Sequence, residues 1–165
     1  MNIVFDEDTG LLLVGEHRLA LEKFEAIFAH NEHWRYIFGK LLEIFRQISC
    51  SHIYVDGSFV TRKPHPSDID VCWHMDEDRA KRNIQLETLF KICPELILLN
   101  DPGNRKLIQD QFCADVFPAN TTETASGLMF KDFFQRDNTN QAKGIIIIDL
   151  PWLRTHNRKT WLKRR

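Results

Sequence analysis

Residues 54–75 read YVDGSFVTRKPHPSDIDVCWHM, and the interpretation of the whole chain depends on this stretch. An apolar run ends in a Gly-Ser pair, Gly57-Ser58. Two aspartates, Asp68 and Asp70, follow with one residue between them, after a segment that contains two prolines. The stretch is either a charged surface turn or a site for metal ions and a phosphate chain.

The residues around the two aspartates have the pattern of a β-strand. Residues 68–74, DIDVCWH, alternate between two sets of side chains, so the apolar set would be buried and Asp68, Asp70, Cys72 and His74 would share the other face. Side chains two residues apart on a strand lie about 6.6 Å apart. Two carboxylates at this spacing can converge on one ion or bracket two ions, as phosphoryl transfer requires. Mg²⁺ prefers such carboxylates together with substrate phosphates.

The Gly-Ser pair follows a second predicted strand, residues 52–55, HIYV. Glycine allows the backbone to pass close to a ligand. A serine hydroxyl and the neighbouring backbone N–H groups can hold phosphate oxygens, so Gly57 and Ser58 are candidate nucleotide-binding residues. Arg62 and Lys63 would add positive charge there, although a solvated surface position explains these two side chains equally well.

A third acid lies in another predicted strand. Residues 113–117, CADVF, are followed by a proline that ends the strand, and Asp115 lies in the middle. A carboxylate among apolar residues is costly to bury without a partner. A metal ion held by Asp68 and Asp70 would be such a partner, and Asp115 is therefore the third candidate ligand.

The remaining elements indicate an α/β (α+β) fold, a mixed sheet with helices packed on it and two helices at the N-terminus. Helical spacing of apolar residues is found in three segments, 19–29, 32–48 and 77–92. Residues 127–135 are also predicted to be helical, and residues 144–150, GIIIIDL, form a β-branched strand. Residues 96–99 fit a strand or a helix.

We expect one domain over residues 1–165. It would comprise a helical N-terminal part, residues 1–50, a catalytic core, residues 51–150, and a basic tail, residues 151–165. The tail has six cations and no acid, interleaved with two tryptophans, and could contact RNA. A solvated terminus or a protein-binding surface would explain it equally well.

Composition excludes several classes of protein. A formal net charge of −1 argues against nucleic-acid binding by bulk charge alone. The four cysteines include no C-x-x-C pair, which argues against a zinc knuckle and favours buried thiols in a reducing compartment. There is no basic, apolar leader and no apolar run long enough for a bilayer. We expect a cytoplasmic protein without membrane contact.

The order of these parts resembles the nucleotidyltransferases of the DNA polymerase beta superfamily. Those proteins share a hydrophobic strand, Gly-Ser or Gly-Gly, about a dozen residues, then acid-hydrophobic-acid-hydrophobic. Here the matching parts are Gly57-Ser58 and Asp68-Ile69-Asp70-Val71, and the motif match covers residues 53–71 and 113–117. The size is similar to that of the minimal, single-domain members, including antitoxin-type proteins and an uncharacterised bacterial branch. Asp56 departs from the pattern, because a hydrophobic residue is common there.

The resemblance implies a polymerase-beta-like fold and a Mg²⁺-dependent nucleotidyltransferase. Gly57 and Ser58 would bind an NTP such as ATP, and Asp68 and Asp70 would bind two Mg²⁺ ions. Asp115 would complete one metal site and help to activate the attacking hydroxyl of a protein, an RNA end or a small molecule.

Two other functions are considered. The first is an antitoxin-like or regulatory module that has the same fold, binds a toxin-like partner protein and has weak or no catalysis. The second is a metal-dependent nuclease, which is disfavoured because no acid-x-lysine pattern follows the two aspartates.

Overall fold

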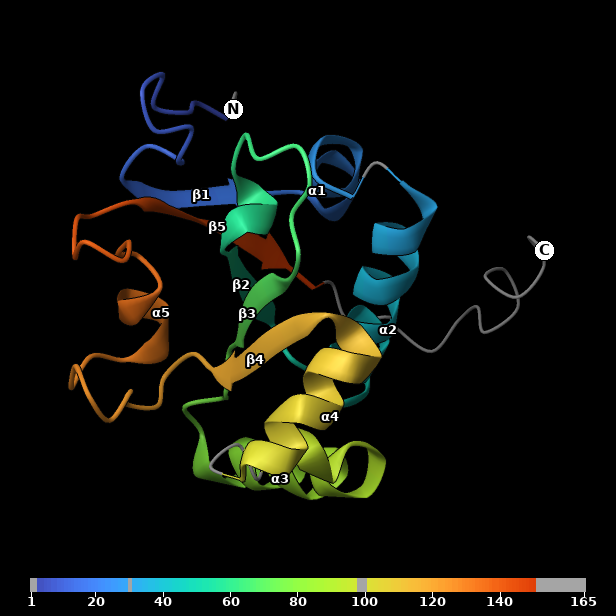
Figure 1. Ribbon diagram of the computed structural model, residues 1–165. Coiled ribbons are helices and arrows are strands. Elements are labelled where there is room, and N and C mark those ends of the chain that lie inside the picture. Colours follow the sequence, from blue (N-terminus) through green and yellow to red (C-terminus); the bar gives the residue numbers. More distant parts are fainter. Residues whose placement is uncertain (1–2, 30, 98–100, 151–165) are drawn as a thin grey trace.

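The computed structural model describes residues 3–29, 31–97 and 101–150, and its centre is a mixed five-stranded sheet (Figure 1). The strand order is β1-β5-β2-β3-β4, in which β2 is antiparallel to β3 and β5, and the outer pairs β1–β5 and β3–β4 are parallel. The strands are β1 (Gly15–Leu19), β2 (His52–Asp56), β3 (Ile69–Trp73), β4 (Ala114–Pro118) and β5 (Gly144–Asp149). The expected mixed α/β architecture is confirmed.

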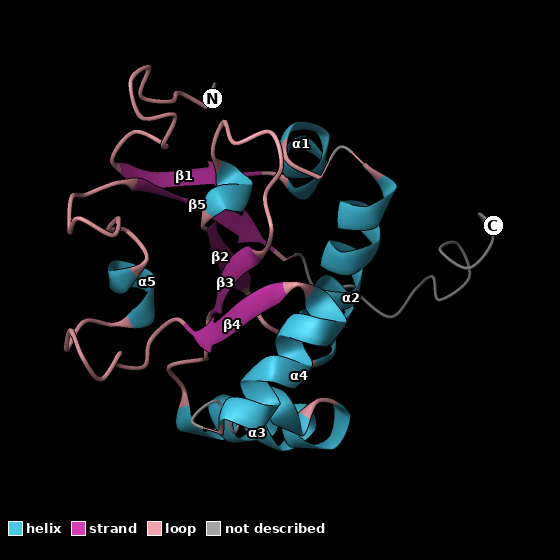
Figure 2. Ribbon diagram, viewed as in Figure 1, coloured by secondary structure: helices cyan, strands magenta, loops and turns pink. Residues whose placement is uncertain are grey.

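Most helices pack on one face of this sheet (Figure 2). They are α1 (Leu21–Ile27), α2 (Glu32–Gln47), α3 (Arg79–Ile92) and α4 (Pro102–Phe112), with two short 3₁₀ helices, η1 (Ser58–Val60) and η2 (Pro94–Leu96). The helix α2 begins where the Asn31 side chain accepts a hydrogen bond from the Trp34 backbone N–H, which satisfies one free donor of the first turn. Its apolar stripe then packs against the buried side chains of the central strands, and this forms the main core.

The opposite face of the sheet is covered by the segment that contains α5 (Phe130–Phe133). The rings of Phe117 and Phe130 stack at 4.3 Å between centroids, and a smaller core of Tyr54, Cys72 and Ile147 lies beneath the segment. Cys72 therefore lies on a second buried face, and the expectation that β3 has one buried face was wrong. The alternation was read correctly, but a neighbouring segment of chain covers its polar side.

The N-terminal part contains a strand that the sequence did not predict. The helices α1 and α2 confirm the two expected N-terminal helices, but β1 precedes them and pairs with β5 at the edge of the sheet. Most of its side chains are at least partly exposed, so hydrophobic alternation is absent. An edge strand is held by backbone pairing on one side, and this leaves little trace in composition.

Two helical segments also differ from expectation. The helix α4 was not predicted, although Asp101 accepts a hydrogen bond from the Gly103 backbone N–H and Pro102 follows it, which is a helix-start signal. The helix α5 is one turn long instead of spanning residues 127–135, because Met129 forms an antiparallel bridge with Thr122 and has an extended backbone.

Residues 96–99, for which strand and helix both fitted, begin inside η2, and residues 98–100 are outside the described residues. The basic tail, residues 151–165, is likewise outside them. Three cysteines are buried, Cys113 is half-buried, and none of these four thiols is oxidised to a disulfide, as expected. Within the part of the chain that the structure describes, no helix is long and apolar enough to cross a membrane.

Candidate functional site

Three acids line up across neighbouring strands at one end of the sheet. Asp56 ends β2 and lies opposite Asp70 in the antiparallel pair, and Asp70 lies in register with Asp115 of the parallel neighbour β4. Residues paired in this way point to the same face of a sheet. Asp68 immediately precedes β3 and accepts a hydrogen bond from Ser67 Oγ at 3.0 Å. We call Asp56, Asp68, Asp70 and Asp115 the acid row.

Gly57 makes the row possible because its backbone passes directly against Asp70. Its φ of 78° and ψ of −166° belong to a region that is almost restricted to glycine. A Cβ at this position would lie 2.9 Å from Asp70 Cγ and closer still to a carboxylate oxygen. The close approach at Gly57 that the structure shows is to the Asp70 side chain, and the predicted approach to a ligand stays a prediction.

We expect Gly57→Ala to lower the free energy of unfolding by about 2–3 kcal/mol, because it combines backbone strain with displacement of the Asp70 carboxylate. Urea denaturation measures the change. The matched control is Gly127→Ala, which has a φ of 72° but no neighbouring atom within 4 Å of the added Cβ. An equal loss in both variants would show that the contact with Asp70 adds nothing.

Burial and repulsion act together on Asp70. Burial, together with the negative charges of Asp56, Asp68 and Asp115, raises the pKa of its carboxyl to about 7, and the charge of Lys143 acts in the opposite direction. Within residues 3–29, 31–97 and 101–150, no group donates a hydrogen bond to this carboxylate. A positive charge beside Asp70 would relieve both effects.

The acid at the end of β2 has its own cation. Lys143 Nζ donates to Asp56 Oδ2 at 2.6 Å, and the side chains are 14% and 4% exposed. Burial raises the pKa of the Asp56 carboxyl, and the Lys143 charge lowers it. Asp56, which departs from the family pattern, is therefore one half of a buried ion pair within the candidate site. Its partner Lys143 directly precedes β5.

Asp115 at the other end of the row is held by two side chains of α4. Arg105 Nε and an Arg105 terminal nitrogen donate to its two oxygens at 2.9 and 2.7 Å, and Gln109 Nε2 donates at 3.1 Å. Residues 105 and 109 face the same side of the helix. Cys113, with a left-handed backbone, turns the chain directly from α4 into β4 and brings that side over Asp115.

The predicted nucleotide-binding residues have different surroundings. The Ser58 hydroxyl is buried, and no described group forms a hydrogen bond with it. A buried hydroxyl without a partner costs roughly 1–3 kcal/mol, which an oxygen of a bound ligand would offset. Arg62 instead lies over the Phe5 ring at 5.4 Å, and the exposed Lys63 has a backbone hydrogen bond to Thr61 Oγ1. The described contacts do not connect either side chain to the acid row.

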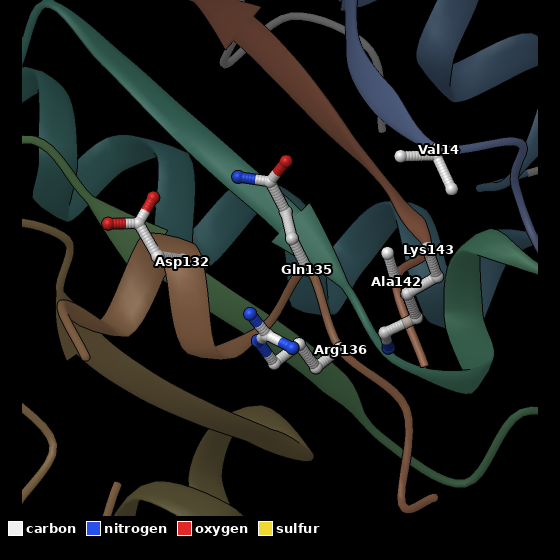
Figure 3. Close-up of a pocket in the computed structure, with 6 residues that line it drawn as sticks. All are labelled: Val14, Asp132, Gln135, Arg136, Ala142 and Lys143. Carbon is white, nitrogen blue, oxygen red and sulfur yellow. The ribbon is translucent and has the colours of Figure 1, made fainter. Parts of the chain in front are cut away.

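A pocket of about 200 Å³ opens at the same end of the sheet (Figure 3). Figure 3 shows Val14, Ala142 and Lys143 on the side of β1 and β5, and side chains of the α5 segment across from them. Those side chains are Asp132, Gln135 and Arg136. Lys143 lines this pocket and pairs with Asp56 of the acid row, so the pocket and the row adjoin.

Sequence reasoning singled out Asp68, Asp70 and Asp115 as site acids, but it missed Asp56 and the partners of Asp56 and Asp115. Lys143 was not predicted to belong to the site, and Arg105 and Gln109 lie on a helix that was not predicted. The Asp101-Pro102 signal could have located that helix and shown that residues 105 and 109 share a face. The pairing of Lys143 with Asp56 joins residues 87 positions apart, and no local pattern indicates it.

The donor set fits hard divalent cations, which prefer carboxylate oxygens. Asp68 and Asp70 present oxygens that no described cation neutralises through an ion pair, and the repulsion at Asp70, which Lys143 offsets only in part, favours a bound cation. Among the described residues, no three acid, histidine or cysteine side chains form a ready-made metal cluster. Both Asp115 oxygens accept hydrogen bonds from Arg105.

The fold and site thus define an α/β protein with a row of acids at one end of a mixed sheet. The chain belongs to a family described as a family of unknown function (DUF6932), which matches residues 3–149. No curated protein and no solved structure matches the chain significantly.

Proposed function

We propose that the protein is a nucleotidyltransferase with a polymerase-beta-like fold, which transfers a nucleoside monophosphate from an NTP to a hydroxyl acceptor. The observation that carries the proposal is the register of Asp70 with Asp115, with Gly57 packed against Asp70. This arrangement agrees with the resemblance of the chain to the DNA polymerase beta superfamily. A site of that kind requires the Gly-Ser and Asp-x-Asp motifs to lie close together. The buried, unpartnered Ser58 hydroxyl is further support, because it is a donor available to a phosphate oxygen.

In this proposal each residue has a defined task. Asp68 and Asp70 would hold Mg²⁺, and Asp115 would complete the site and orient the acceptor hydroxyl. Bound Mg²⁺ would neutralise phosphate charge as the pyrophosphate leaves. Gly57 and Ser58 would position the triphosphate, and Lys143 would partly offset the charge of Asp56 beside Asp70. Catalysis would come mainly from positioning and charge stabilisation.

The proposal predicts Mg²⁺-dependent NTP binding that is lost in Asp70→Asn. Equilibrium dialysis with each labelled NTP, with and without Mg²⁺, measures the affinity, and we expect a loss of at least about tenfold. Asp110→Asn is the matched control. Asp110 is exposed on α4, and the substitution removes the same charge outside the row. If Asp70→Asn binds NTP and Mg²⁺ as the parent does, the site assignment is wrong.

The acceptor requires a separate experiment. The purified protein is incubated with labelled NTP and Mg²⁺ in a cell lysate, and the label is followed into protein, RNA and small molecules. Transfer that the parent performs and Asp70→Asn does not would identify the acceptor class.

The alternative is an antitoxin-like binding module with weak or no catalysis. One observation favours this alternative. Arg105 donates hydrogen bonds to both oxygens of Asp115, the acid that would complete the metal site. Copurification of a partner protein, together with Mg²⁺-independent NTP binding or none, would support this alternative.

A further inference from the structure

Two cations flank the acid row, and their surroundings differ sharply. Lys143 is enclosed with Asp56, whereas the Arg105 side chain is 54% exposed while its partner Asp115 is 13% exposed. Moving Lys143 would leave a buried carboxylate without a counter-charge. Arg105 can leave Asp115 for water without any change in the packed core.

The Arg105 contact uses the atoms that a metal ion would need. Its two hydrogen bonds reach both oxygens of Asp115, and Gln109 donates to one of the same oxygens. A cation that binds between Asp70 and Asp115 therefore has to compete with the guanidinium group. Asp70, the neighbour in register, has no such partner among the described residues.

We infer that Arg105 is an exchangeable counter-cation, which neutralises Asp115 when no metal ion is bound and releases it when a divalent cation binds between Asp70 and Asp115. The inference rests on the proposed metal site. Arg105 is thus a positioning residue, since it acts through Asp115. It reduces like-charge repulsion in the empty row, and it lowers the affinity of the row for a free cation.

The test measures binding of Mn²⁺ alone, without nucleotide, from the electron paramagnetic resonance signal of the free ion. We expect Arg105→Gln to bind Mn²⁺ roughly three- to tenfold more tightly than the parent, because the competing charge and its paired hydrogen bonds are gone. Arg105→Lys retains the positive charge but cannot form the two paired hydrogen bonds. Its Mn²⁺ affinity should lie between those of the parent and Arg105→Gln. Most structural damage would weaken binding, so tighter binding is a diagnostic result.

Lys106→Gln is the matched control, because it removes one positive charge from the adjacent position of α4. Lys106 is 75% exposed and pairs with Asp110, away from the row. It should change the Mn²⁺ affinity by less than about twofold. Adding Asp115→Asn to Arg105→Gln should abolish the gain, because the competition takes place at Asp115.

The outcomes separate the inference from the proposed function. Mn²⁺ binding by the parent with an equal or weaker affinity in Arg105→Gln overturns the inference and leaves the metal site in place. An equal gain in Lys106→Gln also overturns it, since the effect would then be one of net charge. Absence of Mn²⁺ binding by the parent and every variant refutes the proposed metal site and the inference together.

A second measurement observes the release directly. The Arg105 Nε–H group donates to Asp115 Oδ1, so its nuclear magnetic resonance signal reports that hydrogen bond. Addition of Mg²⁺ should shift the signal in the parent and leave it unchanged in Asp70→Asn. A signal that Mg²⁺ does not move in a parent shown to bind the ion would overturn the inference.

Discussion

Asp70→Asn should raise the free energy of unfolding by about 3 kcal/mol at about pH 8 in buffer without divalent cations. The carboxyl is buried beside three other acids, which raises its pKa to about 7. Asparagine retains the shape and carries no charge, so the variant removes the repulsion. The native Asp70, which belongs to the proposed metal site, would therefore lower the stability of the fold when no cation is supplied.

The stabilisation should depend on pH in a defined direction. The pKa of Asp70 is raised from an ordinary value of 3.8, so between about pH 4 and 7 the folded parent binds more protons than the unfolded chain. The stability of the parent therefore falls as the pH rises through this window. The advantage of Asp70→Asn should be near zero at about pH 4 and reach its full value above about pH 7.

Urea denaturation at a series of pH values measures this difference, with Asp110→Asn as the control for loss of one exposed charge. Adding Mg²⁺ should stabilise the parent and leave Asp70→Asn unchanged, because a ligand that binds only the folded state raises stability. An advantage of Asp70→Asn that does not change with pH would contradict the electrostatic cause.

Lys143→Met should lower the free energy of unfolding by about 3–5 kcal/mol, because it leaves the buried Asp56 carboxylate without a counter-charge. Asp56 and Lys143 are 4% and 14% exposed, so solvent replaces little of the lost interaction. The loss should grow as the pH rises and Asp56 ionises. Denaturation by urea measures the change.

Two further variants identify the cause of that loss. Lys143→Met combined with Asp56→Asn should recover most of the stability, since no buried charge remains. Arg18→Met removes the cation of the Arg18–Asp149 pair, whose side chains are more than half exposed, and should lower the free energy of unfolding by less than about 1 kcal/mol. If the double variant is no more stable than Lys143→Met, lost packing is the cause instead of the unpaired charge.

Local patterns predicted most of the elements that form the site. The alternation of residues 68–74 predicted β3, and the β-branched run after Lys143 predicted β5. The edge strand β1 was missed because most of its side chains are at least partly exposed, so its sequence has no alternation of apolar and polar residues. The single-turn α5 was overestimated because its aromatic spacing fits a helix, whereas a backbone bridge at Met129 limits it.

The sequence by itself determined that Asp68 and Asp70 lie where one strand begins and that Gly57-Ser58 follows another. These are consequences of a two-residue period and of turn chemistry, which act over a few residues. Only the tertiary structure decided that Asp56, Asp70 and Asp115 are neighbours and that Lys143 and Arg105 flank them. Strand order and register depend on contacts between distant segments that bury a shared core, and a local pattern contains no record of those contacts.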